Sequence, residues 1–313
     1  MTVLCATRGI VSRGLTRSFG TKLALAPLDL EIDPHGEGMI VGLLGPNGSG
    51  KSTFMRLLTG ISRPDAGTAS VDGVELRGDG AAIRAHATYS PGELHVPTEM
   101  RASELLRWLL RGRDPAALER ARVNAFLFGL DLKKGVRGFS HGMKRQLLFA
   151  AAMAPRVRVR ILDEPTEGLD PSKRGEVLDL MARDAARGTT ILLSSHHLAE
   201  VDRACDRLVF MNEGKMIADE TAASVRERAA RVVRLSWPDN ANLSGIEEKL
   251  AGPGIQSVRR DAALVSVVLE GRDPRPFLAT LADHADLPAP LAIEHGRLSL
   301  RELYRELYGV EGC

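Results

Sequence analysis

Apolar and polar positions follow two different periods along the first two thirds of the chain, from about residue 38 to 220. Residues 39–44, 159–162 and 189–194 are apolar or β-branched runs typical of buried strands. Helical spacing follows the first run, with its apolar positions at Phe54, Leu57, Leu58 and Ile61. Strands that alternate with helices predict an α/β fold, in which a parallel sheet carries helices on its faces.

Three segments depart from this alternation. Residues 68–76 contain Asp72-Gly73 and residues 207–218 contain Asn212-Glu213-Gly214, and both sequences favour a tight turn between antiparallel strands. Residues 93–155 carry apolar positions that indicate mostly helix, at Leu105, Leu106, Leu109, Leu118, Ala125, Phe126 and Leu130. We therefore expect two hairpins, and a helical subdomain at about 93–155 inserted between two strands of the sheet.

After about residue 225 the pattern changes to short strands and helices. We predict strands at 232–237, 255–259, 264–269 and 291–294, with helices at 243–250, 276–285 and 300–307. The first six elements have the order β-α-β-β-α-β, which is that of the ferredoxin-like arrangement. The chain is thus predicted to contain a large domain at 1–225 and a small α+β accessory domain at 226–313.

Composition narrows the class of protein. The 44% of apolar residues is enough to bury a full core, and 42 Lys and Arg against 40 Asp and Glu leave a formal charge of only +2. This balance does not favour a nucleic-acid partner. The three cysteines, Cys5, Cys205 and Cys313, are far apart, which predicts neither a disulfide framework nor a metal site.

The apolar runs are all too short for a membrane helix of roughly 18 residues. The first residues also lack the apolar core of a signal peptide, because Arg8 follows only a few apolar residues. We therefore expect a cytosolic chain, or one held at a membrane only through another protein.

Residues 45–52 match the phosphate-loop pattern in full, with a predicted strand before them and a helix after them. Glycines let backbone N–H groups point inward at a phosphate, and the following helix adds the positive end of its dipole. Lys51 would reach the β- and γ-phosphates, and Ser52 would bind Mg²⁺. The expected ATP-binding residues here are Gly45, Pro46, Asn47, Gly48, Ser49, Gly50, Lys51, Ser52 and Thr53.

Two adjacent acids, Asp163 and Glu164, follow the strand predicted at 159–162. Asp163 would hold Mg²⁺ through water, and Glu164 would act as the general base for the attacking water. An acidic strand end followed by a turn is the alternative interpretation. The further motifs argue against it, because residues 140–146, 168–171 and 194–196 complete a constellation in a fixed order.

With these motifs, residues ~10 to 225 closely resemble the ABC ATPase family. The resemblance implies that Ser140 and Gly142 face the γ-phosphate bound to a second subunit, so that two copies enclose two ATP molecules head to tail. It also implies that Asp170 couples the two sites and that His196 contacts the γ-phosphate. Phe19 matches the aromatic residue that stacks on adenine, although a phenylalanine at a strand end is just as often part of a core.

Three departures from the family pattern are notable. Gly92 stands where a glutamine usually contacts Mg²⁺ and senses the membrane partner, and we expect Glu93 or water to replace it. His141 and Met143 replace a glycine and a glutamine of the signature motif, as in drug- and antibiotic-efflux ATPases. The strand before Asp163 carries Arg158 and Arg160, where continuous apolar residues are expected. We expect the Arg160 guanidinium to extend to the edge of the sheet.

The resemblance implies an ATPase subunit of an exporter of drug- or antibiotic-like compounds, with ATP and Mg²⁺ as cofactors. Its expected partners are a second copy of the chain and an integral membrane permease, which would hold it at the inner face of the membrane. The alternative is a soluble ABC ATPase that acts on ribosomes or DNA. One phosphate loop, no long heptad pattern and a near-neutral charge argue against that alternative.

Overall fold

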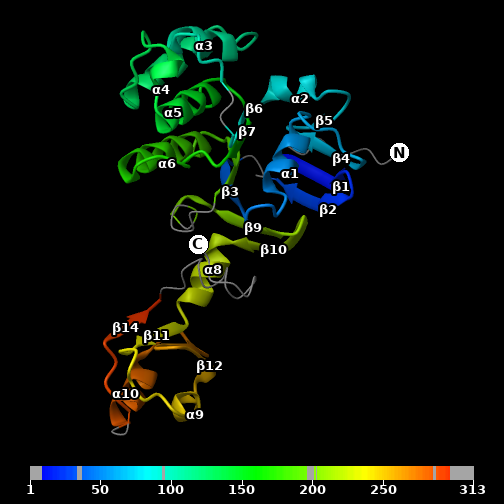
Figure 1. The fold of residues 1–313 in the computed structure, drawn as a ribbon. Coiled ribbons are helices and arrows are strands. Elements are labelled where there is room, and N and C mark those ends of the chain that lie inside the picture. Colours follow the sequence, from blue (N-terminus) through cyan, green and yellow to red (C-terminus); the bar gives the residue numbers. More distant parts are fainter. Residues whose placement is uncertain are drawn as a thin grey trace. The chain divides into compact units, whose positions relative to one another are not determined.

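The computed structural model describes residues 9–33, 37–93, 96–195, 201, 203–284 and 287–296. The chain divides into two compact units, Met1–Asp219 and Glu220–Cys313 (Figure 1). The boundary falls shortly before the residue 225 expected from the sequence, because helix α8 (Ala222–Ala229) is grouped with the second unit. Thr221 caps this helix by accepting a hydrogen bond from the Ser224 amide at 3.0 Å.

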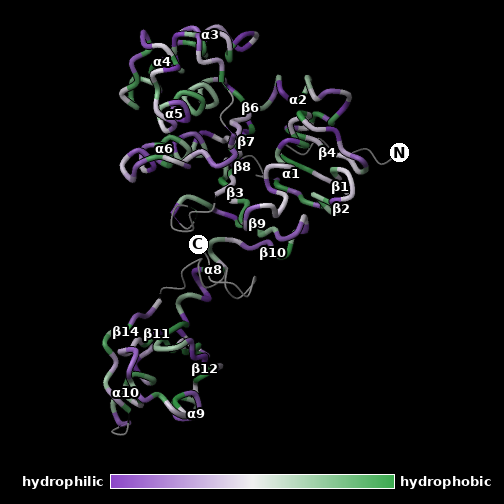
Figure 2. The backbone as a smooth tube through the Cα atoms, in the orientation of Figure 1, coloured by the Kyte–Doolittle hydropathy of each residue, from purple (hydrophilic) through white to green (hydrophobic). Residues whose placement is uncertain are grey.

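A six-stranded sheet forms the centre of the first unit, in the order β10-β9-β3-β8-β7-β6. The strands are β3 (Met39–Leu44), β6 (Ala87–Ser90), β7 (Val159–Asp163), β8 (Thr190–Ser194), β9 (Arg207–Asn212) and β10 (Lys215–Thr221). The pairs β3·β8, β3·β9, β7·β8 and β6·β7 are parallel. Figure 2 shows the mainly hydrophobic colour of β3 beside the more polar helix α6 (Pro171–Ala185). The predicted parallel α/β sheet is confirmed.

A second sheet, which the sequence patterns indicate only in part, has the order β2-β1-β4-β5 and is antiparallel. Its strands are β1 (Ile10–Phe19), β2 (Lys22–Ile32), β4 (Ala66–Val71) and β5 (Val74–Glu75). The hairpin predicted at 68–76 is present, and Asp72 and Gly73 both have positive φ, as a two-residue primed turn requires. Glu213 and Gly214 form the corresponding turn between β9 and β10.

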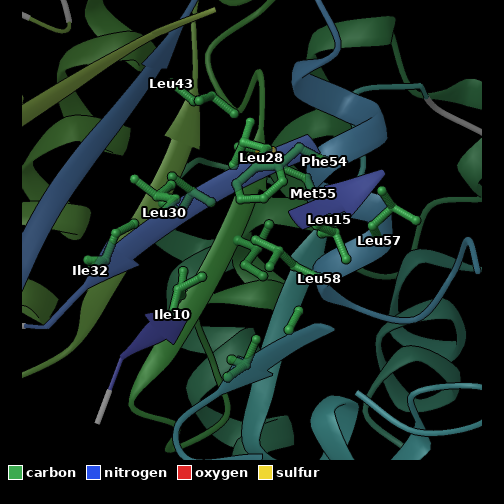
Figure 3. Packing of buried hydrophobic residues seen from close by; sticks show 14 of the residues in the cluster. Ile10, Leu15, Leu28, Leu30, Ile32, Leu43, Phe54, Met55, Leu57 and Leu58 are labelled. Carbon is green, nitrogen blue, oxygen red and sulfur yellow. The ribbon is translucent and has the colours of Figure 1, made fainter. Parts of the chain in front are cut away.

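Helix α1 (Lys51–Leu58) packs between the two sheets. Figure 3 shows Leu28 of β2, Leu43 of β3 and Phe54 of α1 directed into one apolar cluster. The prediction that Ile61 continues this helical face is wrong, because the chain leaves the helix at Gly60, where φ is 68°, and Ile61 is 52% exposed.

The segment between β6 and β7 is mostly helical, as predicted. It contains α3 (Ala102–Leu109), α4 (Ala117–Leu127), a short 3₁₀ turn (Val136–Gly138) and α5 (His141–Ala152), while α2 (Ala81–His86) precedes β6. Phe126 lies in α4, as the helical pattern predicts, but its side chain is 81% exposed while Ala121 and Ala125 carry the buried face of the helix. In the described part of the chain, no helix is long and apolar enough to cross a bilayer.

The second unit contains, after α8, strands β11 (Val232–Ser236), β12 (Ile255–Asp261), β13 (Leu264–Leu269) and β14 (Ala292–His295) with helices α9 (Ile246–Leu250) and α10 (Arg275–Asp283). The sheet order is β12-β13-β11-β14, and every adjacent pair is antiparallel. Its own core includes Trp237, whose indole N–H donates to the Pro288 carbonyl at 2.7 Å. The element order agrees with the prediction, and assignment to the ferredoxin-like class stays a prediction. The helix expected at 300–307 lies outside the described residues.

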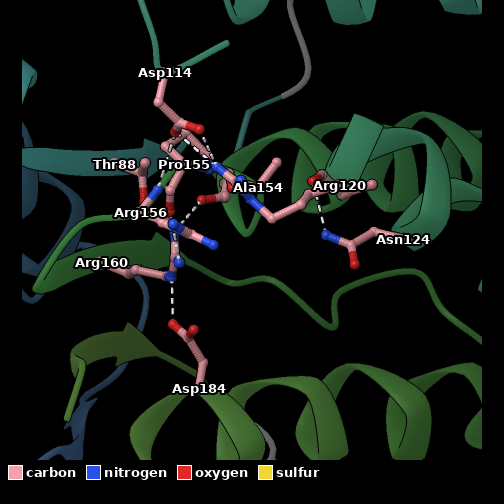
Figure 4. A network of polar contacts seen from close by, with 11 residues as sticks. Thr88, Asp114, Arg120, Asn124, Ala154, Pro155, Arg156, Arg160 and Asp184 are labelled. Atoms are coloured by element: carbon pink, nitrogen blue, oxygen red, sulfur yellow. Dashed lines mark hydrogen bonds and ion pairs between the residues drawn. The ribbon is translucent and has the colours of Figure 1, made fainter. Parts of the chain in front are cut away.

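The Arg160 guanidinium reaches Thr88 of the edge strand β6 at 3.3 Å, but the expectation that it extends along the sheet to solvent is wrong. Arg160 is only 2% exposed, and its guanidinium donates to Asp184 at 2.6 Å and to the carbonyls of Ala152 at 2.6 Å and Pro155 at 3.0 Å (Figure 4). Arg160 thus joins β7 to α6 and to the end of α5. The cation is tolerated inside the fold because an acid and several acceptors surround it.

We expect Arg160→Leu to lower the free energy of unfolding by about 3–5 kcal/mol, because it leaves Asp184 and two buried carbonyls without their donor. Urea denaturation followed by circular dichroism measures this change. Arg158→Leu is the matched control, since Arg158 is exposed and should change stability by less than about 0.5 kcal/mol. Equal stability of the two variants would contradict a structural role for the Arg160 network.

Candidate functional site

The predicted phosphate loop connects β3 to α1 and encloses the side chain of Lys51. The loop turns back on itself through a hydrogen bond from the Ser49 amide to the Pro46 carbonyl at 3.1 Å. Lys51 is buried, and its Nζ donates to the carbonyls of Gly45 at 2.7 Å and Pro46 at 3.0 Å. The ammonium is therefore held at the centre of the loop, where a phosphate would be bound.

Two glycines of this loop are required by close backbone contacts. A Cβ at Gly45 would lie 2.3 Å from the Met211 carbonyl oxygen, and one at Gly50 would lie 2.7 Å from the Ala24 carbonyl oxygen. Gly50 also has φ of 101° at the N-cap of α1. The loop can therefore pack against β2 and β9 only with hydrogen at these positions.

The two candidate carboxylates lie at the carboxyl end of β7. In the parallel register Asp163 pairs with Ser194, the last residue of β8. The Ser194 hydroxyl donates to Asp163 Oδ1 at 2.6 Å and accepts a hydrogen bond from the Glu164 amide at 2.9 Å. A single serine thus orients the carboxylate of Asp163 and the backbone of Glu164.

Glu164 has an unusual backbone conformation for a residue other than glycine, with φ of 47°. Such left-handed residues carry strain of order 1–3 kcal/mol and occur often in functional sites. The strain is accepted here at the residue predicted to be the general base.

The charges of this region interact with one another. Burial lowers the pKa of Lys51, while the carboxylates of Glu164 and Asp163 oppose that shift by favouring the charged ammonium. The phosphate loop and the two acids therefore form one electrostatic group, although more than a hundred residues separate them in the chain.

The donors present fit Mg²⁺ bound together with a nucleotide. Asp163 is a buried carboxylate, and Ser52 follows Lys51 at the start of α1, so the available ligands are hard oxygen atoms. Mg²⁺ is commonly bound by one or two carboxylates and by substrate phosphates. No cluster of three or more His, Cys, Asp or Glu side chains that could hold a metal ion occurs within the described ranges.

Ser140 and Gly142 lie at the first turn of α5. The Ser140 hydroxyl accepts a hydrogen bond from the Met143 amide at 3.2 Å and thereby caps the helix. A Cβ at Gly142 would lie 3.0 Å from the Gly168 carbonyl oxygen, so the helix packs against the loop after Glu164. Ser140 is exposed, which leaves this helix end accessible.

Asp170 caps α6 at the end of the same loop. Its carboxylate accepts hydrogen bonds from the Lys173 amide at 3.0 Å and the Ser172 hydroxyl at 2.7 Å, and these bonds lower its pKa. Asp170 therefore has a defined structural role, and its predicted coupling role stays a prediction.

Phe19 and His196 are the remaining predicted nucleotide contacts. Phe19 is 51% exposed at the end of β1, and the Arg17 guanidinium lies 4.9 Å from its ring centroid. The alternative interpretation of Phe19 as a core residue is therefore wrong, and stacking on adenine stays a prediction. His196 lies outside the described residues.

Gly92 lies directly beside the predicted metal ligand. A Cβ at this position would meet Asp163 Oδ2 at 3.2 Å, which is a tight contact. Glu93 does not share this position, because its carboxylate pairs with Arg56 at 3.4 Å and its side chain is 70% exposed. Metal binding by Glu93 therefore stays a prediction, and the pairing of its carboxylate with Arg56 does not support it.

The sequence interpretation missed Arg145. This buried residue of α5 donates from Nη1 to the Glu164 carbonyl at 2.6 Å and from Nη2 to the Gly92 carbonyl at 2.8 Å. Burial lowers its pKa, and the acids of Glu167, Glu164 and Asp163 counteract this effect. Arg145 thus joins helix α5, the loop at Gly92 and the backbone of Glu164, the predicted general base. The only sign of this role in the sequence is that a charged arginine stands in a mainly apolar helix.

A parallel sheet with a phosphate loop at the end of one strand and paired acids at the end of another defines a P-loop nucleotide hydrolase. Known proteins narrow this class. A family model for "ABC transporter" matches residues 27–167. The daunorubicin/doxorubicin resistance ATP-binding protein of Streptomyces peucetius is 31% identical over 97% of this chain and 93% of its own. A Nod factor export ATP-binding protein of Paraburkholderia xenovorans is 34% identical over 92% of this chain and 95% of its own.

Solved structures agree with this result. A structure described as the ATP-binding subunit of an ABC transporter has a TM-score of 0.61 and 28% identity, and the match covers 69% of this chain and 91% of that chain. A dimeric bacterial ABC transporter cassette matches with a TM-score of 0.62 at 22% identity, over 68% of this chain and 98% of the other, and supports the fold. The chain belongs to the ABC transporter family as an ATP-binding subunit, and it is an ATPase.

We expect Arg145→Met to lower kcat for ATP hydrolysis by about 10- to 100-fold with little change in KM, because the phosphate loop is unchanged while Glu164 loses its support. Hydrogen bonds from charged donors contribute about 1.5–3 kcal/mol each, which is consistent with this range. Steady-state ATPase kinetics measure the effect.

Lys144→Met is the control, because it removes one charge from the adjacent position of the same helix. The melting temperature of each variant identifies any general loss of stability. Wild-type kcat in Arg145→Met, or an equal loss in Lys144→Met, would contradict the positioning role.

Proposed function

We propose that this chain is the ATP-hydrolysing subunit of an exporter of drug- or antibiotic-like compounds. The observation that carries the proposal is the match to the daunorubicin/doxorubicin resistance protein along 97% of this chain, which includes the second unit as well as the cassette. The match to a Nod factor export protein has a similar extent. Agreement along both units favours an exporter over a soluble ATPase that acts on ribosomes or DNA.

The active form in this proposal is a head-to-tail homodimer. The capped N-terminus of α5 is exposed at Ser140, and the dipole of this 12-residue helix favours an anion there. A second copy would present the γ-phosphate of its ATP to Ser140 and Gly142. The dimeric cassette among the solved structures has the same fold, which favours a dimer for this chain as well.

Hydrolysis follows from the groups at the ends of β3, β7 and β8. Backbone N–H groups of the loop and the Lys51 ammonium bind the phosphates. The Glu164 carboxylate accepts a proton as a water oxygen attacks the γ-phosphorus, and the bond to the bridging oxygen of ADP breaks. Ser52 and Asp163 would hold Mg²⁺, which would neutralise part of the phosphate charge when it is bound. His196 would contact the γ-phosphate, as the family pattern implies.

The membrane permease is the second proposed partner, and it would hold the chain at the inner face of the cell membrane. The helical segment 93–155 and the loop at Gly92 would form the docking surface. Arg145 supports this coupling route, because the same guanidinium binds the carbonyls of Gly92 and Glu164. A movement of the loop would therefore reach the base through one side chain.

We expect Glu164→Gln to bind ATP with near wild-type affinity, to hydrolyse it at least 100-fold more slowly, and to accumulate as a dimer in the presence of ATP. Removal of a general base lowers rates by about 10²–10⁴-fold. Phosphate release measures turnover, and size-exclusion chromatography with ATP measures the dimer. Glu176→Gln, on α6, is the control and should keep wild-type turnover and a monomer–dimer profile like that of the wild type.

Export is tested separately in the native host. Replacement of the chromosomal gene by the Glu164→Gln allele should raise the intracellular accumulation of cationic drugs such as doxorubicin. Suppose that a panel of drug-like dyes accumulates to the same level as in the wild type, although the purified variant has lost ATPase activity. That result would contradict the exporter proposal, while the assignment of the protein as an ATPase would stand.

A further inference from the structure

A basic cavity of about 670 Å³ lies at the amino ends of β6, β7 and β8. Residues that precede these strands line it, including Arg158 before β7 and Thr189 before β8. Five arginines and two aspartates contribute to the lining, and the arginines are Arg120, Arg156, Arg158, Arg160 and Arg187. The cavity is therefore strongly positive, although the chain as a whole is nearly neutral.

Two of the five arginines already have acidic partners (Figure 4). Arg160 pairs with Asp184 at 2.6 Å, and Arg120 donates to both carboxylate oxygens of Asp114 at 2.6 and 2.7 Å. These pairs form an ordered and largely neutralised side of the cavity. Asp72, the other aspartate of the lining, faces His86 at 3.8 Å.

The other three arginines are not neutralised in this way. Arg158 and Arg187 form no ion pair within the described part of the chain. Arg156 donates a hydrogen bond from its backbone amide to Asp114 at 3.4 Å, and its positive charge also acts on that carboxylate, which is already held by Arg120. Both Arg158 and Arg187 are exposed, so their guanidinium groups are accessible to a ligand. Three cations gathered at one hollow repel each other unless an anion joins them.

This cavity is separate from the ATP site. The strands β6, β7 and β8 are parallel, and Asp163 and Ser194 stand at their carboxyl ends. The basic cavity lies where the same strands begin. At about 3.3 Å per residue, β7 places roughly 13 Å between Val159 and Asp163.

The lining indicates the chemistry of the ligand. Its cationic side chains are arginines, whose planar forks bind phosphate oxygens in pairs. Within the residues described, the lining contains no Phe, Tyr or Trp ring for stacking on a base, and its one imidazole, His86, lies 3.8 Å from the Asp72 carboxylate. The volume is in the range of small-molecule sites, about 300–1,000 Å³. These features fit a compact, highly charged anion and disfavour a nucleoside.

We propose that this cavity, with Arg156, Arg158 and Arg187 as the binding groups, is a site for a small anion that carries several phosphate groups. The buried Arg160 forms its floor, with Asp184 fixing the guanidinium. The site is independent of the catalytic reaction and does not depend on the export function.

Isothermal titration calorimetry with inorganic tripolyphosphate in magnesium-free buffer tests the site. Lys51→Ala in the full-length chain serves as the background, because it weakens binding at the phosphate loop. We expect one binding event to persist there, and to weaken at least tenfold when Arg158→Ala and Arg187→Ala are added. The affinity should also fall with rising salt concentration.

Arg183→Ala with Arg226→Ala is the charge-matched control, since both arginines are exposed and neither lines the cavity. This pair should leave the affinity unchanged, and the melting temperatures of both pairs should stay near that of the background. The proposal is overturned if no binding persists in Lys51→Ala, or if the control pair weakens binding equally. Citrate binding as tight as that of tripolyphosphate would overturn the assignment to phosphate.

Discussion

The parallel register of β3, β8 and β7 is the constraint on which the candidate site depends. Ser194 of β8 pairs with Leu43 of β3 on one side and with Asp163 of β7 on the other. The phosphate loop after β3 and the acids after β7 therefore reach the same level at one edge of the sheet. A shift of one residue would separate the Ser194 hydroxyl from both Asp163 and the Glu164 amide. The positions of the catalytic residues are thus set first by the pairing of the strands and only then by contacts between side chains.

Two buried arginines reinforce this frame from opposite ends of β7. Arg160 binds Asp184 and the carbonyls at the end of α5, while Arg145 binds the carbonyls of Gly92 and Glu164. Burial of a cation is unfavourable unless its donors are satisfied, so each guanidinium strongly favours one arrangement of the segments around it. Helix α5 contributes to both networks, and its position is therefore linked to the base at one end and to the core at the other.

Sequence patterns predict the motif-bearing elements well and the long-range contacts poorly. The phosphate loop and the strand before Asp163 are local, since each depends on neighbouring residues. The partners of Arg145 and Arg160 come from distant segments, and no spacing along the chain reveals them. Ile61 and Phe126 show a different limit, because a helical period does not tell where Gly60 ends a helix or which apolar residue stays exposed. Metal binding by Glu93 was likewise inferred from its position next to Gly92 in the chain, whereas its carboxylate forms an ion pair with Arg56.

The left-handed backbone at Glu164 has a consequence for how this ATPase changes over evolution. Glycine adopts φ near 47° without strain, so the fold by itself would prefer glycine at this position. Retention of glutamate therefore lowers the stability of the fold and keeps the general base for ATP hydrolysis. A lineage that no longer needs hydrolysis would gain stability by losing this carboxylate, and a glycine here in a related chain would mark a cassette that has ceased to be a motor.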